Sequence, residues 1–158
     1  LQKKELMGLV PGIKELMQKY PERIKTPRDL AVEVNGKRKE ISVEQMPQNY
    51  PIFDIGPKTV EDYGKIIKTA KSIVVSGPMG VYENPEFAFG TKQVFEEIAN
   101  SKAFSLAGGG HTISALDEFK LSKKISYVST AGGALIEFLM GKKLPGVGAL
   151  EKAAARKT

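Results

Sequence analysis

Short loops rich in glycine occur three times from residue 76 onward, and their composition suits anion binding. They are Ser76-Gly77-Pro78-Met79-Gly80, Gly108-Gly109-Gly110-His111-Thr112 and Ser129-Thr130-Ala131-Gly132-Gly133. Backbone N–H groups in such loops can surround an anion, and the N-terminus of a following helix adds the positive end of its dipole. One such loop could be any tight turn of an α/β protein. Three of them favour a ligand that carries phosphate, most simply a nucleotide.

The segments around these loops predict how the loops are positioned. Short apolar strands are expected at Ile73–Val75, Ala103–Ala107 and Ile125–Val128. An amphipathic helix is expected after each loop, and Thr91 is expected to cap the first of them. Strands that alternate with helices form a parallel sheet with right-handed crossovers. All three loops then lie at the carboxyl edge of one sheet, where open α/β sheets bind ligands. We therefore expect an α/β fold, a Rossmann-like three-layer αβα arrangement with a mainly parallel sheet.

The first third of the sequence predicts an antiparallel addition to that sheet. Asn35-Gly36 separates two alternating segments, Leu30–Val34 and Arg38–Val43. Asn-Gly between alternating segments is a strong β-hairpin signal. We assign this hairpin a structural role.

Composition excludes several classes of function. The 158 residues suit one domain, and 41% hydrophobic and 27% charged residues are ordinary for a globular protein. The absence of cysteine excludes disulfides, thiolate zinc sites and a cysteine nucleophile. The net charge is +6, but no basic helix is interleaved with aromatic residues, so we expect no nucleic-acid partner. No apolar segment approaches about 20 residues, so we expect no membrane span and a cytoplasmic protein.

Five motifs, in order, resemble the carboxyl-terminal domain of the phosphoglycerate kinase family. They are Ser-Gly-Pro-Met-Gly-Val-Tyr-Glu, Phe-Ala-Phe-Gly-Thr, Ala-Gly-Gly-Gly-His-Thr, Val-Ser-Thr-Ala-Gly-Gly-Ala and Gly-Lys-Lys-Leu-Pro-Gly-Val. The stretch Asp54–Thr59 resembles that domain too, and the likeness runs from about Leu6 to Leu150. It implies reversible phosphoryl transfer between 1,3-bisphosphoglycerate and ADP, giving 3-phosphoglycerate and ATP, with Mg²⁺ accompanying the nucleotide.

The resemblance also implies roles for particular residues. Glu83 corresponds to the carboxylate at the ribose hydroxyls, and the less favoured alternative is a solvated surface glutamate. Pro78 and Val81 correspond to residues that line the nucleoside pocket. The phosphate contacts fall on Gly108, Gly109, Gly110, His111 and Thr112. The stabilisation of the transferring phosphoryl group, the catalytic role, falls on Gly132 and Gly133, and no residue is expected to bind a metal directly.

Two positions depart from the family pattern. Ser76 stands where familiar members have asparagine, and serine keeps a hydroxyl but reaches less far toward a nucleotide. His111, the single histidine, stands where many members have aspartate. A neutral imidazole is a poor Mg²⁺ ligand, whereas a protonated one can pair with phosphate. A capping or packing role for His111 is equally open.

The start of the sequence indicates a piece of a longer protein. It begins at Leu1 rather than methionine and continues at once with apolar residues such as Leu6 and Leu9. We expect residues 1–158 to be a single domain with a tail at 151–158, part of the C-terminal nucleotide-binding domain of a two-domain kinase. Its partner would be the missing N-terminal domain, which binds phosphoglycerate. The isolated chain is then expected to be inactive.

Two alternatives remain. The chain could be a nucleotide-binding fragment without catalysis. A Rossmann-type oxidoreductase is less favoured, because Gly108-Gly109-Gly110 does not have the Gly-x-Gly-x-x-Gly spacing that dinucleotide binding requires.

Overall fold

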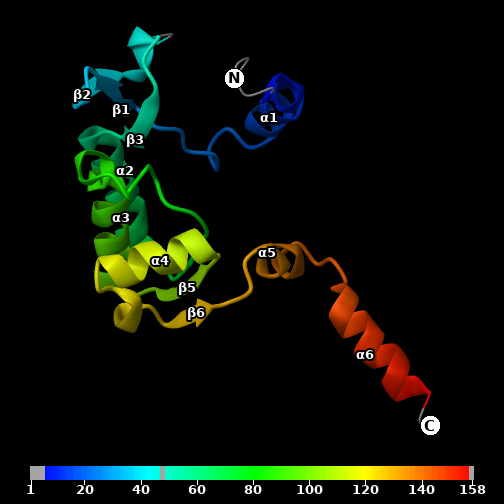
Figure 1. Ribbon diagram of the computed structural model, residues 1–158. Coiled ribbons are helices and arrows are strands. Elements are labelled where there is room, and N and C mark those ends of the chain that lie inside the picture. The colour runs from blue at the N-terminus through cyan, green and yellow to red at the C-terminus, as the bar shows by residue number, and fades with distance from the viewer. Residues whose placement is uncertain (1–5, 47–48, 157–158) are drawn as a thin grey trace.

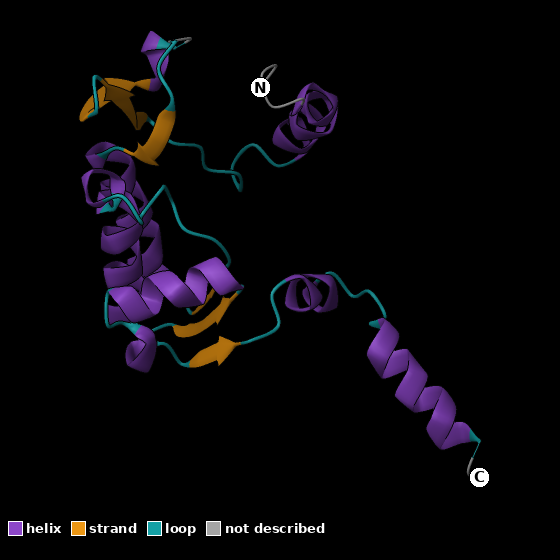
Figure 2. Cartoon of the chain, in the orientation of Figure 1, coloured by secondary structure: helices purple, strands orange, loops and turns teal. Residues whose placement is uncertain are grey.

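The computed structural model describes residues 6–46 and 49–156 and contains two sheets, with some helices between them and others extending away (Figure 1). Figure 2 shows the strands and helices in the same orientation. The helices are α1 (Val10–Lys19), α2 (Pro57–Thr69), α3 (Phe89–Asn100), α4 (Gly110–Glu118), α5 (Gly133–Leu139) and α6 (Pro145–Ala155). The strands are β1 (Asp29–Val34), β2 (Lys37–Ser42), β3 (Ile52–Ile55), β4 (Ser72–Val75), β5 (Phe104–Gly108) and β6 (Tyr127–Ser129). Short 3-10 helices are η2 (Leu6–Leu9), η3 (Val43–Gln45), η4 (Pro85–Phe87) and η5 (Ser122–Lys124).

The predicted hairpin is confirmed. β1 and β2 pair in antiparallel fashion, and the turn between them has positive φ at both Asn35 (52°) and Gly36 (75°). Positive φ at both central residues is typical of the hairpin turn that Asn-Gly favours. β3 pairs with the other edge of β1, also antiparallel, giving the order β2-β1-β3. The hairpin therefore belongs to a separate antiparallel sheet, rather than extending the parallel one.

The predicted parallel sheet is confirmed, with small changes in strand bounds. Its order is β4-β5-β6, and both pairs are parallel. The third strand begins at Tyr127 rather than at the predicted Ile125, because η5 ends at Lys124 and Ile125 follows as its C-cap. The α/β class, with a parallel sheet and a hairpin, is therefore correct.

One face of the parallel sheet packs against the helical layer. Val75 and Ala107 lie directly opposite each other on neighbouring strands, and both join the buried core cluster. The helices contribute Val94, Phe95, Ile98, Ala115 and Leu116 to the same cluster. On the other face, Val74, Phe104 and Tyr127 are 50%, 57% and 59% exposed. Parallel sheets normally bury both faces, so this exposed apolar face is unusual.

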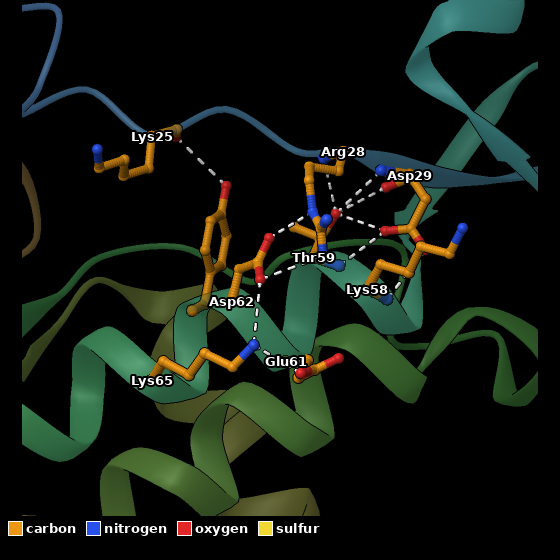
Figure 3. A network of polar contacts seen from close by, with 9 residues as sticks. Lys25, Arg28, Asp29, Lys58, Thr59, Glu61, Asp62 and Lys65 are labelled. Carbon is orange, nitrogen blue, oxygen red and sulfur yellow. Dashed lines mark hydrogen bonds and ion pairs between the residues drawn. The ribbon is translucent and has the colours of Figure 1, made fainter.

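An aspartate on β1 fixes the start of α2 (Figure 3). Gly56, the N-cap of α2, offers no side chain, and Asp29 takes its place. Its carboxylate accepts hydrogen bonds from the backbone nitrogens of Lys58 (3.0 Å) and Thr59 (2.8 Å) and from the Thr59 hydroxyl (2.6 Å). Burial acts to raise the pKa of Asp29, but these hydrogen bonds and the charge of Lys58 outweigh it and lower that pKa overall. α2 is thereby tied to the antiparallel sheet.

The terminal helices contribute little to the core. α1 has no buried residue among those the structure describes, and Gly148 is the buried residue of α6. Figure 1 shows both helices extending away from the sheets. Within the described residues, no helix combines the length and the apolar character needed to cross a membrane.

Candidate functional site

The three glycine loops meet at the carboxyl edge of the parallel sheet. Val75, Ala107 and Val128 are aligned across the three strands, and Gly108 is paired with Ser129. A Cβ atom added to Gly132 would lie 3.3 Å from the Cα atom of Gly109, so the second and third loops are in contact. The sheet therefore brings the loops together, as their order in the sequence predicts.

A hydrogen bond joins the first loop to the second. The backbone nitrogen of Gly77 donates to the hydroxyl oxygen of Thr112, 2.7 Å away. Thr112 is fully buried, so this side chain faces the neighbouring loop rather than solvent. The phosphate contact of Thr112 stays a prediction. Thr112 also has a structural role, because its hydroxyl holds the backbone of Gly77.

Gly109 directs the second loop into α4. Its φ of +98° lies in a region that other residues resist, and it precedes the first residue of the helix, Gly110. Within the described chain, no side chain caps this helix start. Gly110 and His111 are exposed there, whereas Gly108 is buried at the end of β5. The uncapped amides at the start of α4 can therefore face an anion.

Residues Gly77–Glu83, which we call the nucleoside loop after the contacts that the sequence analysis predicts for it, are held by α3 and β3. The Thr91 hydroxyl accepts hydrogen bonds from the backbone nitrogens of Met79 (3.1 Å) and Gly80 (3.2 Å). Val81 donates its backbone N–H to the carbonyl of Phe53, 2.8 Å away. The sequence predicts Thr91 as a helix cap, and this is wrong: Ala88 is the N-cap of α3, and Thr91 lies inside the helix.

The predicted nucleoside contacts lie on the surface of this loop. Val81 is 41% exposed, Glu83 is exposed and Pro78 is half-buried. Tyr82, which lies between Val81 and Glu83 in the sequence, is buried and packs its ring edge-on against the ring of Phe119. Burial raises the pKa of Tyr82, and the nearby carboxylates of Glu83 and Glu118 raise it further. Tyr82 therefore stays protonated at neutral pH and anchors the loop, while Val81 and Glu83 remain available to a ligand.

Gly132 and Gly133, the predicted catalytic pair, lie at the start of α5. Gly132 is the N-cap, and Gly133 is the exposed first residue of the helix. Leu135 of α5 approaches Gly108 so closely that a Cβ at Gly108 would lie 2.5 Å from a Leu135 methyl carbon. The third loop is therefore adjacent to the second, and the catalytic role of its glycines stays a prediction.

Among residues 6–46 and 49–156, no group of three His, Cys, Asp or Glu side chains could hold a metal ion. A cavity of about 600 Å³ lies elsewhere, between the antiparallel sheet and the start of α2, and its lining includes Arg28, Glu40 and Lys58. A nucleotide at the glycine loops would therefore be held by the loops themselves rather than by this cavity.

Two residues behind the site were missed by the sequence analysis. Arg38 of β2 donates a hydrogen bond to the Asp54 carboxylate at 2.8 Å, and the same carboxylate oxygen accepts one from the backbone nitrogen of Gly90 at 2.7 Å. An acidic residue inside an apolar strand is a signal that a cation lies nearby. Asp54 carries that signal, but Arg38 could be identified as the partner of Asp54 only from the order of the strands in the sheet.

Comparison with known proteins identifies relatives along most of the chain. The family model described as "Phosphoglycerate kinase" matches residues 2–142. The phosphoglycerate kinase of Methanothermus fervidus is 41% identical over 156 residues, covering 99% of this chain and 38% of that protein. The phosphoglycerate kinase of Methanococcus maripaludis is 46% identical over 140 residues, covering 88% of this chain and 34% of that protein.

Solved structures agree with these sequence matches. The phosphoglycerate kinase of Pyrococcus horikoshii superposes with a TM-score of 0.86 at 41% identity, covering 95% of this chain and 38% of that one. The phosphoglycerate kinase of Coxiella burnetii gives a TM-score of 0.81 at 38% identity, covering 86% of this chain and 37% of that one. The chain thus spans little more than a third of the length of these relatives.

Proposed function

The chain belongs to the phosphoglycerate kinase family, and we propose that it forms the nucleotide-binding part of an enzyme that transfers a phosphoryl group reversibly. The reaction takes 1,3-bisphosphoglycerate and ADP to 3-phosphoglycerate and ATP, a step of glycolysis and gluconeogenesis, in the cytoplasm. The observation that carries this proposal is the contact between the three loops, joined by the bond from Gly77 to Thr112. The family match argues against the alternative of a Rossmann-type oxidoreductase.

The accessible groups suggest how ADP or ATP would lie. The uncapped start of α4, with Gly109, Gly110 and His111, would receive the phosphates, because free amides and the helix dipole favour negative charge. The exposed carboxylate of Glu83 would accept hydrogen bonds from the ribose hydroxyls, and Val81 and Pro78 would contact the base. Gly132 and Gly133 would face the phosphoryl group in transfer.

Mg²⁺ would enter this site bound to the phosphates of the nucleotide rather than to a side chain of the chain. It prefers oxygen ligands and keeps several waters, so phosphate oxygens suffice to hold it. His111 is a poor ligand for it, and a protonated His111 would pair with phosphate instead. Bound there, Mg²⁺ would neutralise phosphate charge.

Phosphoryl transfer needs positioning, charge neutralisation and exclusion of water more than covalent help from the protein. This chain would position the nucleotide at the loop edge and supply amide donors to its phosphates. The rest of the longer protein would hold phosphoglycerate and bring it to that edge by domain closure. The second candidate, a nucleotide-binding fragment without catalysis, is favoured for the isolated chain by its coverage of 38% of the relatives' length.

Titration of the purified chain with ADP, followed by backbone NMR shifts, tests the proposal. We expect shifts at Gly77–Glu83 and at Gly108–Thr112, with inorganic pyrophosphate shifting only the second set. Glu83→Gln should weaken ADP binding about tenfold, as expected for the loss of charge-assisted hydrogen bonds, and should leave pyrophosphate binding unchanged. The matched control is Glu86→Gln, which changes another exposed glutamate of the same segment. Shifts confined to the opposite edge of the sheet would contradict the proposal.

A further inference from the structure

A buried carboxylate lies directly behind the nucleoside loop. The side chain of Asp54, on β3, is 0% exposed. One of its oxygens, Oδ2, accepts hydrogen bonds from Arg38 and from the backbone nitrogen of Gly90, the second residue of α3. The other, Oδ1, has no hydrogen-bond partner among the described residues. Buried polar atoms are normally paired, so this placement needs an explanation.

The unpaired oxygen, Oδ1 of Asp54, lies between the nucleoside loop and α3. A Cβ atom added to Gly80 would lie 2.5 Å from Oδ1 of Asp54, and one added to Gly90 would lie closer still. Real Cβ atoms do not approach that closely, so glycine at both positions is what allows the carboxylate to sit there. Asp54 therefore contacts the loop and the helix start at the same time.

Arg38 connects this carboxylate on β3 to β2, on the far side of the central strand of the antiparallel sheet. Ala31 of β1 lies opposite Asp54 of β3. Arg38 of β2 lies opposite Glu33, which is two residues along β1 from Ala31. The side chains of Arg38, Ala31 and Asp54 therefore share one face of the sheet. The small Ala31 leaves room for the guanidinium to cross β1 and reach β3. The Arg38 side chain is only 15% exposed.

The guanidinium group also reaches the segment before α3. It donates hydrogen bonds to the carbonyls of Ile55 (3.0 Å) and Glu86 (3.3 Å). Its Cζ atom lies 5.3 Å from the centre of the Phe89 ring, a cation–π distance. One side chain thus joins β3, η4 and the first turn of α3, which the planar fork of arginine allows and lysine does not.

We infer that Arg38 and Asp54 are positioning residues for the nucleoside loop. They fix the first turn of α3, and Thr91 in that turn holds the amides of Met79 and Gly80. The loop in turn presents Val81 and Glu83. This inference rests on the proposed function in so far as the loop is taken to contact a nucleoside. Gly77, at the start of the same loop, is held by Thr112 of α4 instead, so this end of the loop and the second glycine loop should not depend on Arg38.

Hydrogen exchange of the ligand-free chain tests the mechanical part. Arg38→Met keeps the length of the side chain and removes its charge and donors. We expect the amides of Met79, Gly80 and Gly90 to exchange about tenfold faster, while the amide of Gly77 is unchanged. Arg38→Lys, which keeps the charge next to Asp54, should restore part of the protection. The control is Arg28→Met, which removes a surface ion pair with Asp62 and should change none of these amides.

A uniform increase at all four amides, or no increase at any, would overturn the inference, because either would show that Arg38 does not act specifically on the part of the loop that Thr91 holds. If Arg38→Met fails to fold, Asp54→Asn replaces it in the same measurement. The new amide side chain would keep an acceptor for Gly90 while removing the charge that Arg38 faces, so the same three amides should lose protection relative to Gly77. Unchanged protection in Asp54→Asn would likewise overturn the inference.

Ligand binding tests the functional part and separates it from the proposed function. In Arg38→Met, affinity for ADP should fall about tenfold, and affinity for inorganic pyrophosphate should stay within about twofold. Equal losses for both ligands would overturn the specific role in nucleoside positioning. If the original chain binds no ADP at all, the proposed function fails, and with it the nucleoside role of the loop. The exchange pattern still decides whether Arg38 and Asp54 position the loop.

Discussion

The hydroxyl oxygen of Thr112 accepts a hydrogen bond from the backbone nitrogen of Gly77, 2.7 Å away. The two residues belong to loops that follow different strands, β4 and β5, which pair in parallel. Thr112 is fully buried and Gly77 is half-buried, so the bond is partly shielded from water. The side chain of one loop therefore sets the position of the backbone of the other.

Replacing Thr112 by valine should weaken this connection without changing the shape of the side chain. The Gly77 amide would lose its acceptor, so we expect the free energy of unfolding to fall by about 1–2 kcal/mol. Thr112→Ser, which keeps the hydroxyl, should lose less. Denaturant unfolding measures both, and Thr69→Val, at an exposed threonine bonded only within its own helix, is the control. Equal stability of Thr112→Val and the original chain would show that the bond contributes nothing.

A second prediction compares two neighbouring glycines. Gly109 has a φ of +98°, whereas Gly110 does not have a positive φ and has open space around a would-be Cβ. Gly109→Ala should therefore destabilise the chain by about 1–2 kcal/mol, and Gly110→Ala should change stability by less than about 0.5 kcal/mol. Thermal unfolding of the two variants under identical conditions measures the difference. A larger loss in Gly110→Ala would mean that the loop backbone differs from the one described.

The sequence predicts the loop edge well because local signals and topology agree there. Short apolar segments, glycine loops and amphipathic helices each indicate the same unit, and parallel pairing places the loops at one edge. The connection from Arg38 to Asp54 could not be predicted in this way. It depends on β2 and β3 flanking β1, and on a small residue, Ala31, between them. Nothing local in the hairpin sequence distinguishes Arg38 from its neighbours Lys37 and Lys39.

The sequence also says little about what covers each face of the sheet. Val74 alternates with the inward-facing Ile73 and Val75 and reads simply as part of an apolar strand, yet it is 50% exposed. Ile66, predicted to face inward from α2, is 47% exposed. Hydrophobicity indicates that a side chain favours burial, but it does not indicate whether a neighbour is present to bury it.

The low pKa of Asp29 predicts how stability depends on pH. A carboxyl whose pKa in the folded state lies below its ordinary value of 3.8 stabilises the fold above that value. This contribution is lost as pH falls through the lower folded pKa. Asp29→Asn removes the charge and leaves one acceptor oxygen in place of two, so it should lower the free energy of unfolding at pH 7 by about 1 kcal/mol, the usual net contribution of one hydrogen bond.

Below about pH 4 the difference between the two proteins should shrink, because the original chain also loses its ionised carboxylate. Urea unfolding at a series of pH values from about 2 to 7 measures this convergence. Glu22→Gln is the matched control, because the side chain of Glu22 is 94% exposed. This substitution should change the free energy of unfolding neither at pH 7 nor below about pH 4. A constant difference at every pH would contradict the assigned role of the Asp29 charge.

The last prediction concerns turnover by the chain alone. It spans 38% of the length of the Methanothermus fervidus relative, and the proposed site holds one of two substrates. Effective molarities of about 10⁵ M or more arise only when both reactants are held together, and they lower the barrier by roughly 7–11 kcal/mol. Without that contribution, amides at the loop edge can stabilise only a phosphoryl group that is delivered to them.

A coupled assay with ATP, Mg²⁺ and 3-phosphoglycerate should therefore show only background with the purified chain, while the full-length Methanothermus fervidus enzyme in the same assay should show turnover. ADP binding by the chain in the absence of turnover would separate a nucleotide-binding part from a complete kinase. Robust turnover by the chain would contradict this division of roles. The site for phosphoglycerate would then have to lie on this chain, between the hairpin at Asn35-Gly36 and the glycine loops, where the cavity lined by Arg28 and Lys58 would be the first place to test by substitution.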